Sequence, residues 1–253
     1  MKMREVYNPM SLVGKTILVT GASSGIGQAI AIECSKLGAT VICTARNESR
    51  LLETLSFMEG VGHSHIAADL TDAVALDALV EQLPKLDGVS HNAGMGQTML
   101  TSFAKDEEVM RVITTNALSI VQLQTRLLKK RKINKKASLV FMSSIGGTIV
   151  SPGNTFYGMS KAALVPYVKG LAHELGKKGI RANSIHPGMV ETPLIHRKDI
   201  DDKEAYEIDK ARYPLGRYGE PQDVAHLAAF LLSDASSWIT GSQYIIDGGR
   251  LVF

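Results

Sequence analysis

Tyr157 and Lys161 lie four positions apart in the stretch TFYGMSKAAL, which small and apolar residues otherwise dominate. On a helix, side chains four positions apart share one face. A free phenol has a pKa near ~10, which is poorly matched to proton transfer at neutral pH. A cation one turn away favours the phenolate, and lowering the phenol pKa by about three units takes roughly 4 kcal/mol. The pair therefore predicts an acid–base tyrosine, although spacing alone fits a core tyrosine beside a solvent-reaching lysine more often.

A glycine-rich turn, LVTGASSGIGQAI, places Gly21, Gly25 and Gly27 between an apolar run and a helical pattern. Glycine lets the backbone turn tightly and approach a ligand, and the N–H groups of a first helical turn attract anions. Ser23 and Ser24 add hydroxyls that can cap the helix or contact a phosphate. The spacing is G-x-x-x-G-x-G and not G-x-G-x-x-G, so the mechanism carries over and that fingerprint does not. We predict a phosphate-binding turn, with a ligand-free turn as the alternative.

The end of the second apolar run indicates which dinucleotide this turn would hold. An NAD enzyme carries an acid there that grips the ribose 2′-OH, whereas this sequence reads CTARNES, with Ala45 followed by Arg46. A guanidinium suits a 2′-phosphate. The sequence therefore favours NADP(H) over NAD(H), which stays open because Arg46 can also begin a solvated turn.

The elements that must position these residues alternate along almost the whole chain. Strand patterns occupy residues 15–20, 40–45, 63–69, 87–94, 137–144, 180–188 and 242–249. Helical patterns occupy residues 27–38, 48–58, 72–83, 106–130, 157–177 and 220–233. Such βαβ alternation predicts an α/β fold with a parallel sheet covered by helices on both faces. Pro166 should bend or interrupt the helix that carries Lys161.

No composition shift divides the chain, so residues 1–253 are predicted to form a single dinucleotide-binding and catalytic domain. Residues 1–12 are expected to be disordered or loosely attached. Residues 189–218 read as one long irregular segment with charges and three tyrosines, and we expect a flap over the substrate there.

Composition excludes several classes of protein. A formal charge of +3 is too small to indicate a polyanionic partner, and the run KKRKINKK falls at a helix end, where cations offset the helix dipole. No apolar run reaches the roughly 20 residues that span a bilayer, and the N-terminus lacks a signal peptide pattern. With only Cys34 and Cys43, a reducing cytoplasm is expected. His63 and His65 share a strand face without a third ligand nearby, so no metal site is predicted.

In sequence order, these motifs resemble the short-chain dehydrogenase/reductase family, and within it most closely the β-ketoacyl-[acyl-carrier-protein] reductases and their relatives. The similarity spans Lys15 to Gly249, with Ser144 thirteen positions before Tyr157. The motifs are TGASSGIG, AADL, HNAG, TTNALS, FMSSIGG, YGMSK, HPGMVETP and ITGSQYIIDGG. His91 replaces the commoner first asparagine of the family's NNAG, and Ser24 stands where many NADP(H) members carry a second basic residue.

The resemblance implies a single Rossmann-type domain with a seven-stranded sheet, commonly assembled as a homotetramer. It implies a catalytic set of Asn116, Ser144, Tyr157 and Lys161, in which Ser144 polarises the substrate oxygen and Asn116 holds a water that links Lys161 to solvent. It also implies cofactor contacts by Gly21, Ser23, Ser24, Gly25, Ile26, Gly27, Arg46, Asp69, Leu70, Asn92, Ala93, Gly94, Tyr157, Lys161, Pro187, Gly188, Val190 and Thr192.

These observations lead to an NADP(H)-dependent oxidoreductase that transfers a hydride between the nicotinamide and a carbonyl or secondary alcohol. The leading substrate is a 3-oxoacyl thioester carried on acyl carrier protein, and a steroid, sugar or other secondary alcohol is the alternative. A non-catalytic dinucleotide sensor and a nucleic-acid-binding protein are hypotheses of other classes, and we rank the latter last.

Overall fold

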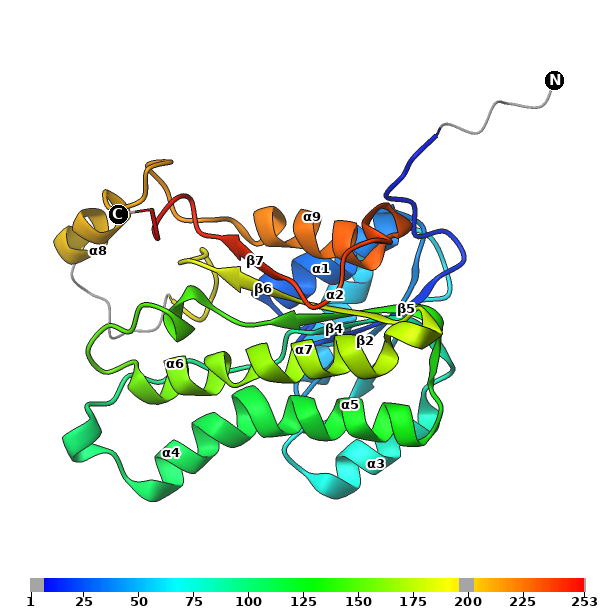
Figure 1. The fold of residues 1–253 in the computed structure, drawn as a ribbon, viewed down its shortest axis with the longest axis horizontal. Coiled ribbons are helices and arrows are strands. Elements are labelled where there is room, and N and C mark those ends of the chain that lie inside the picture. Colours follow the sequence, from blue (N-terminus) through cyan, green and yellow to red (C-terminus); the bar gives the residue numbers. More distant parts are fainter. Residues whose placement is uncertain (1–6, 196–202, 253) are drawn as a thin grey trace.

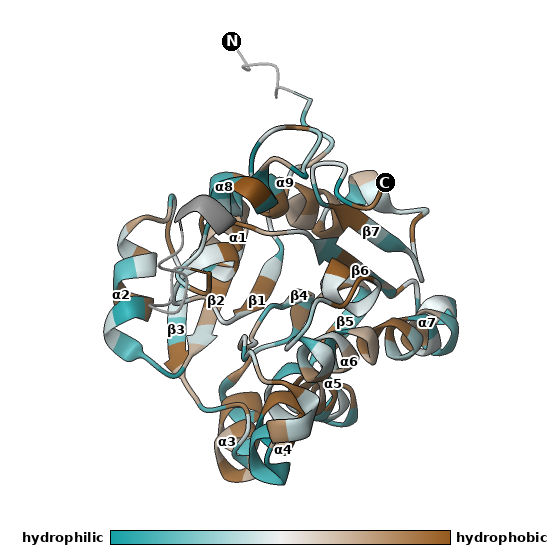
Figure 2. Cartoon of the chain, turned by 90° about the vertical axis from the view of Figure 1, so that its left-hand side faces the viewer, coloured by the Kyte–Doolittle hydropathy of each residue, from teal (hydrophilic) through white to brown (hydrophobic). Residues whose placement is uncertain are grey.

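Seven parallel strands form one continuous sheet in the computed structural model, which describes residues 7–195 and 203–252. The strand order is β3-β2-β1-β4-β5-β6-β7, so the chain reverses direction across the sheet between β1 and β4 (Figure 2). The strands are β1 Thr16–Thr20, β2 Thr40–Ala45, β3 Ser64–Ala67, β4 Leu86–His91, β5 Ile133–Met142, β6 Arg181–Pro187 and β7 Gln243–Ile246. In open parallel sheets, ligands bind beyond the carboxyl ends of the strands near such a reversal.

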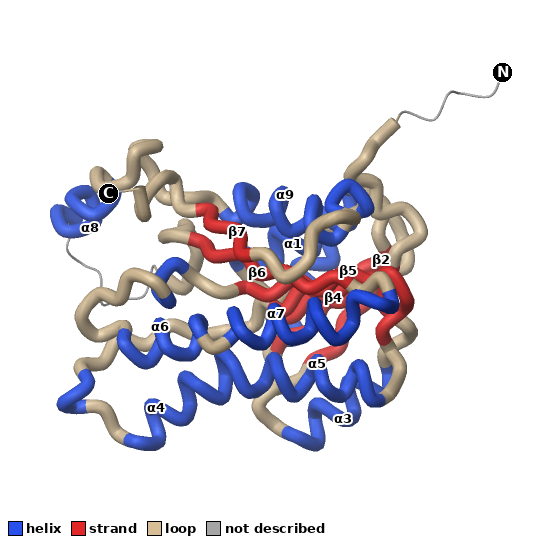
Figure 3. Tube along the Cα trace, viewed as in Figure 1, coloured by secondary structure: helices blue, strands red, loops and turns tan. Residues whose placement is uncertain are grey.

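Helices cover both faces of this sheet (Figures 1 and 3). On one face lie α1 Gly25–Lys36, α2 Glu48–Ser56 and α9 Pro221–Leu232. On the other lie α3 Ala73–Gln82, α4 Asp106–Ile113, α5 Ser119–Lys129, α6 Thr155–Ala162 and α7 Leu164–Leu175. A further helix, α8 Lys203–Lys210, lies beyond the carboxyl end of the sheet at the left of Figure 1. Because parallel strands need long crossovers, each helix carries the chain back across the sheet before the next strand begins.

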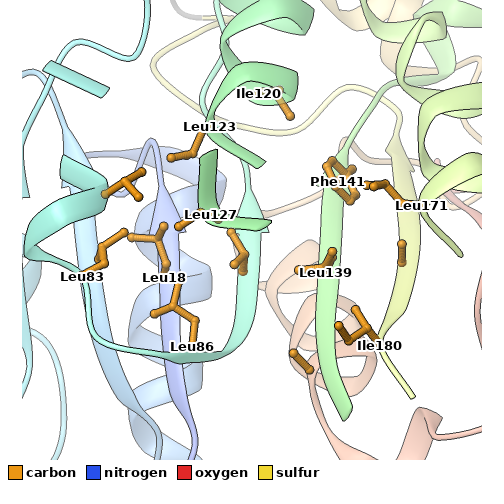
Figure 4. Close-up of a cluster of buried hydrophobic side chains, with 14 of the residues drawn as sticks. Leu18, Leu83, Leu86, Ile120, Leu123, Leu127, Leu139, Phe141, Leu171 and Ile180 are labelled. Carbon is orange, nitrogen blue, oxygen red and sulfur yellow. The ribbon is translucent and has the colours of Figure 1, made fainter. Parts of the chain in front are cut away.

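The core consists of two apolar layers, one between each face of the sheet and its helices. Figure 4 shows part of the layer under α3, α5 and α7, where Leu18, Leu123 and Phe141 contribute fully buried side chains. Burying a side chain of this size contributes roughly 1.5–3 kcal/mol. These layers hold the carboxyl ends of β1, β4 and β5 rigidly, and the candidate site lies at those ends.

The predicted fold class, a single α/β domain with a parallel seven-stranded sheet, is confirmed. The predicted long helix over 106–130 is continuous, but residues Thr114–Leu118 form a π turn between α4 and α5. The helix after Tyr157 is interrupted at Ala163, which separates α6 from α7. That break precedes Pro166. In a regular helix the ring of Pro166 would clash with the carbonyl group of Ala162.

Two predicted segment boundaries need correction. Within the predicted loose N-terminus (1–12), residues 1–6 lie outside the described residues, but Leu12 is fully buried and its N–H donates to the carbonyl of Leu37. The predicted irregular flap (189–218) contains helix α8, and its residues 196–202 lie outside the described part.

Candidate active site

Tyr157 and Lys161 lie on α6, which packs closely on the loop after β5. Two glycines permit this approach: a Cβ on Gly147 would lie 3.2 Å from the backbone of Ala162, and one on Gly158 would overlap the carbonyl oxygen of Gly146. Lys161 is 4% exposed and Tyr157 is half-buried. The helix face that carries both side chains therefore points into the protein and not to solvent.

Ser144 lies beside Tyr157 because the β5–α6 loop turns back over α6. The two side chains are hydrogen-bonded, and a Cβ on Gly146 would lie 3.2 Å from Ser144 Oγ and 3.3 Å from Tyr157 Cε1. Ser144 Oγ also accepts a hydrogen bond from the N–H of Gly146 at 3.0 Å, which orients the hydroxyl. The ring of His186, at the end of β6, hydrogen-bonds to the backbone of Ser144 and to Ser184 Oγ. Two strand ends thus hold the serine against the phenol.

The protein's own groups shift the pKa of the Tyr157 phenol upward, whereas the predicted lowering also involves the charge of the nicotinamide ring. Burial raises this pKa, and the hydrogen bond with Ser144 offsets only part of the increase. Lys161 was expected to lower it, but burial also lowers the pKa of Lys161, to about 8. Its ammonium donates a hydrogen bond to the Met142 carbonyl, with Nζ 3.0 Å from the oxygen. The phenol is therefore protonated at neutral pH, as an acid that donates a proton must be.

Asn116 lies in the π turn and is fully buried. Its Oδ1 accepts from the N–H of Met95 at 2.7 Å, and its Nδ2 donates to the Met95 carbonyl at 2.9 Å. A Cβ on Gly94 would lie 3.1 Å from Lys161 Nζ and 3.2 Å from Asn116 Oδ1. Asn116 and Lys161 thus flank the same glycine, and a side chain at this position would crowd both of them. Single π turns of this kind recur at functional sites.

The glycine-rich turn forms a tight connection from β1 to α1. Gly21 and Gly25 have φ angles of 65° and 56°, which favour glycine. A Cβ on Gly27 would overlap the carbonyl oxygen of Gly21 and lie 2.5 Å from Asn92 Nδ2, so this position allows no side chain. Ser24 is the N-cap of α1, but its hydroxyl does not cap the helix, and no acid lies in the first turn. The start of α1 therefore keeps the donors and the charge that an anion requires.

The chain on both sides of this turn is held by hydrogen bonds to strand ends. Thr20 Oγ1 accepts from the N–H groups of Asn92 and Ala93, at 2.9 and 3.0 Å. Thr192 lies over the turn, because a Cβ on Gly25 would be 3.1 Å from its methyl group. The other predicted cofactor residues of this region also lie at the carboxyl edge of the sheet: Ser23 in the turn, Ile26 in the first turn of α1, Pro187 at the end of β6, and Gly188 and Val190 after it.

Arg46 and Asp69 lie at the ends of β2 and β3, on the same side of the turn. Arg46 is exposed. The pKa of Asp69 is lowered overall: burial raises it, whereas hydrogen bonds from Thr71 and the charge of Arg46 lower it. Leu70 follows and is 7% exposed. The guanidinium and the carboxylate are thus close enough to interact at the carboxyl ends of β2 and β3, where dinucleotide-binding folds hold the ribose of the adenosine.

The residues present fit a dinucleotide. The fit rests on the glycine turn, which has no room for a Cβ at position 27, on the uncapped start of α1, and on Arg46 at the edge of β2. When bound, such a group would supply a hydride to, or accept one from, a substrate carbon. The predicted site residues are brought to one edge of the sheet, in two groups centred on Gly25 and on Tyr157.

Sequence reasoning missed several contacts within this site. The hydroxyl of Thr20, the carbonyl of Met142 and the hydroxyl of Ser160 each hold a predicted site residue. Thr20 and Ser160 directly precede Gly21 and Lys161, so adjacency to a motif was the only available signal. A main-chain carbonyl carries no sequence signal.

The two histidines His63 and His65, and the basic run KKRKINKK, make local structural contacts. His63 Nδ1 accepts from the N–H of Val41 at 3.2 Å, and His65 Nε2 lies 3.2 Å from Glu48 Oε1. Among the described residues, no three His, Cys, Asp or Glu side chains could hold a metal ion. Lys130 in the basic run pairs with Glu81 at 2.6 Å. Over residues 7–195 and 203–252, no helix has the length and apolar character needed to cross a bilayer.

Comparison with known proteins supplies the family context. A family model described as enoyl-(acyl carrier protein) reductase matches residues 21–250. The chain is 36% identical over 243 residues to the 3-oxoacyl-[acyl-carrier-protein] reductase FabG of Rickettsia conorii, covering 96% of this chain and 99% of that protein. It is 33% identical over 244 residues to FabG of Escherichia coli, covering 95% and 98%. A solved short-chain dehydrogenase/reductase from Serratia marcescens superposes with a TM-score of 0.86 at 31% identity, covering 96% of this chain and 99% of that one.

Proposed function

Because this chain belongs to the short-chain dehydrogenase/reductase family, whose members are oxidoreductases acting on CH–OH groups, we propose that it is an NADP(H)-dependent 3-oxoacyl-[acyl-carrier-protein] reductase. The names of the similar curated proteins support the substrate, and Arg46 at the end of β2 supports the cofactor. The hydrogen-bonded pair of Ser144 and Tyr157, beside a buried Lys161, carries the proposed chemistry.

The arrangement is suited to reducing a carbonyl group. Hydride addition to the carbonyl carbon leaves negative charge on the oxygen, which needs a hydrogen-bond donor and a proton. Ser144 Oγ is oriented by Gly146 and can donate to that oxygen. The Tyr157 phenol, whose pKa burial raises, keeps its proton at neutral pH and can transfer it to the oxygen. This protonation state favours the reductive direction.

Lys161 and Asn116 are proposed to restore that proton. The pKa of Lys161 is lowered to about 8 by burial, so its ammonium can release a proton near neutral pH. Asn116 flanks the same glycine as Lys161 Nζ and is proposed to hold the water that connects this lysine to solvent. Lys161 is also proposed to contact the nicotinamide ribose.

The description of the matching family model names an enoyl reductase, which reduces a carbon–carbon double bond. Two adjacent hydroxyl groups, those of Ser144 and Tyr157, can both donate to a substrate oxygen, which suits a carbonyl better. The 3-oxoacyl reductases among the similar proteins support the same choice.

A turnover assay with one matched control tests the proposal. NADPH oxidation is followed with acetoacetyl thioesters for the wild type, Tyr157→Phe and Tyr167→Phe, while fluorescence measures NADPH binding. We expect Tyr157→Phe to lose at least a hundredfold in kcat and still bind NADPH. Tyr167 lies on α7 with its ring against Phe141 of β5, and Tyr167→Phe should keep most activity. Unchanged turnover in Tyr157→Phe would refute the role of this residue.

A panel of substrates distinguishes the proposed 3-oxoacyl reductase from a dehydrogenase for another alcohol and from a non-catalytic sensor. Thioesters, steroids, sugars and simple secondary alcohols are tested with both cofactors. Reduction of a non-thioester carbonyl alone would replace the proposed substrate class, and NADPH binding without any turnover would identify a sensor.

We further propose a homotetramer in the cytoplasm that takes its substrate from acyl carrier protein. The exposed outer edge of β7 and the neighbouring Trp238, which is 99% exposed, support an additional subunit contact. Light scattering of the purified protein measures the assembly mass, and a monomer mass would contradict the proposal.

A further inference from the structure

Ser160 occupies the point where the helix of Tyr157 and Lys161 meets the π turn of Asn116. Its side chain is 1% exposed, and its hydroxyl donates to the Tyr157 carbonyl, with Oγ 2.7 Å from the oxygen. The same hydroxyl accepts a hydrogen bond from Asn116 Nδ2 at 3.1 Å. These residues are 44 positions apart, so only the tertiary fold brings them together.

We infer that Ser160 is a positioning residue whose hydroxyl fixes the Asn116 carboxamide against the catalytic helix. The inference rests on the proposed function, because it assigns to Ser160 a role that acts through Asn116. It adds a residue to the site without placing that residue in contact with substrate or cofactor.

The first reason is the orientation of the Asn116 side chain. Its Oδ1 faces the N–H of Met95, and its Nδ2 is shared between the Met95 carbonyl and Ser160 Oγ. Met95 alone ties the amide to the loop after β4. Ser160 links the Asn116 amide to α6. Among the described residues, no other hydrogen bond joins this amide to that helix. Removing the Ser160 hydroxyl would leave a buried amide donor unsatisfied, which disfavours the present orientation of the side chain.

The second reason is what lies next to the amide. Gly94 separates Asn116 Oδ1 from Lys161 Nζ, with each atom close to the position that a Gly94 Cβ would take. A small displacement of the amide therefore changes the surroundings of the ammonium directly.

The alternative is that Ser160 only satisfies its own hydroxyl, since helical serines often bond to a carbonyl in the preceding turn. Ser143 offers a matched comparison for this alternative. Its side chain is 3% exposed, and its hydroxyl donates to the Lys161 carbonyl, with Oγ 2.9 Å from the oxygen. Ser143 thus makes the same kind of bond to the same helix, but no hydrogen bond joins it to Asn116 among the described residues.

The activity test is a double-mutant cycle of Ser160→Ala with Asn116→Ala, with Ser143→Ala as the matched control. We expect Ser160→Ala to lower kcat about tenfold, leave the KM for NADPH within about twofold, and shift the pH–rate profile. Ser143→Ala should leave the pH–rate profile in place. In the Asn116→Ala background, Ser160→Ala should have no further effect on kcat, because the two act as a unit. Additive losses would overturn the inference.

A second measurement is independent of activity. With ¹⁵N-labelled asparagine, we expect the side-chain N–H signals of Asn116 to shift and to exchange faster with solvent in Ser160→Ala but not in Ser143→Ala. Ser160→Thr, which keeps the hydroxyl, should restore both signals and kcat, even if the alanine variant is poorly folded. Unchanged Asn116 signals in Ser160→Ala would refute the inference. If the wild type reduces no carbonyl, the proposed function fails, and these signals still decide the role of Ser160.

Discussion

Lys161 and Met142 are joined by a hydrogen bond from the buried ammonium to the main-chain carbonyl, with Nζ 3.0 Å from the oxygen. The bond connects the catalytic helix to the carboxyl end of β5. It satisfies one donor of a cation that is otherwise enclosed, since the side chain is 4% exposed. Burial disfavours the charged form and lowers the pKa of this lysine to about 8. The site therefore keeps its acid–base lysine at a cost in folding stability.

That cost predicts a pH-dependent effect of Lys161→Met. The pKa of this lysine is lower in the folded state than in the unfolded state, where it is near 10.5. Wild-type stability should therefore rise as pH increases from about 8 to 10.5, by roughly 3 kcal/mol. We expect Lys161→Met to be inactive yet more stable than the wild type at pH 7, with the advantage disappearing by pH 10. Urea unfolding at both pH values measures this, with the exposed Lys129→Met as control. An advantage that persists at pH 10 would contradict the assigned cause.

His91 should make folding stability depend on pH in the acid range. Its fully buried ring stacks on Phe141 at 4.6 Å, and Nε2 lies 2.8 Å from Gln124 Oε1. Burial lowers its pKa to about 4, so the unfolded chain binds a proton between pH 6.5 and 4 that the folded chain does not. The wild type should lose about 3 kcal/mol of stability over that interval through this residue.

Replacing His91 should make folding stability less dependent on pH between pH 6.5 and 4. His91→Asn is expected to lower stability at pH 7, because the stacked ring is lost, and to reduce the further loss between pH 6.5 and 4. His226→Asn, whose ring is 63% exposed, is the control. Thermal melts across this range make the comparison, and parallel curves for His91→Asn and the wild type would rule out the mechanism.

Gly27→Ala should disrupt the phosphate-binding turn. The new methyl group would overlap the Gly21 carbonyl and crowd Asn92 Nδ2 at 2.5 Å. We expect NADPH affinity to fall more than tenfold and stability to fall by about 1–3 kcal/mol. Gly170→Ala on α7 is the matched control, because nothing lies within 4 Å of its Cβ, and alanine should raise stability by up to about 1 kcal/mol. Normal NADPH binding by Gly27→Ala would show that the ligand does not use this turn.

Arg46→Ala should change cofactor preference. Without the guanidinium, a 2′-phosphate loses its only proposed cationic partner, so we expect NADPH affinity to fall about tenfold or more while NADH affinity changes little. Arg50→Ala, an exposed arginine on α2, is the control for the loss of one positive charge. Titrations with both cofactors measure the ratio. Equal losses for NADPH and NADH would assign Arg46 to a general surface role.

Much of this molecule could be predicted by reading its sequence. Alternating apolar runs and helical patterns located all seven strands, because a parallel sheet buried on both faces requires such runs. The glycines after β1 and the pair of Tyr157 and Lys161 located the candidate site, because few residue types satisfy their local geometry. The helix break before Pro166 followed from proline chemistry alone.

Other features escaped prediction for a common reason. The π turn at Asn116 lies inside one continuous helical run, and helix α8 is only eight residues long, so neither stands out in the sequence. Leu12 falls in the predicted loose terminus, but it packs into the core with residues distant in sequence, and its N–H donates to the carbonyl of Leu37.

The sequence by itself determined the types and order of the site residues, and with them the family and the class of reaction. The tertiary structure alone decided how those residues are charged and connected. Local spacing suggested that Lys161 would lower the pKa of Tyr157, but Lys161 is buried and Tyr157 is half-buried, and desolvation lowers the pKa of the lysine and raises that of the tyrosine. The partners of Lys161 and Asn116, a strand carbonyl and the Ser160 hydroxyl, come from segments 19 and 44 residues away. Burial and long-range approach are properties of the whole packed chain, so no local pattern of residues encodes them.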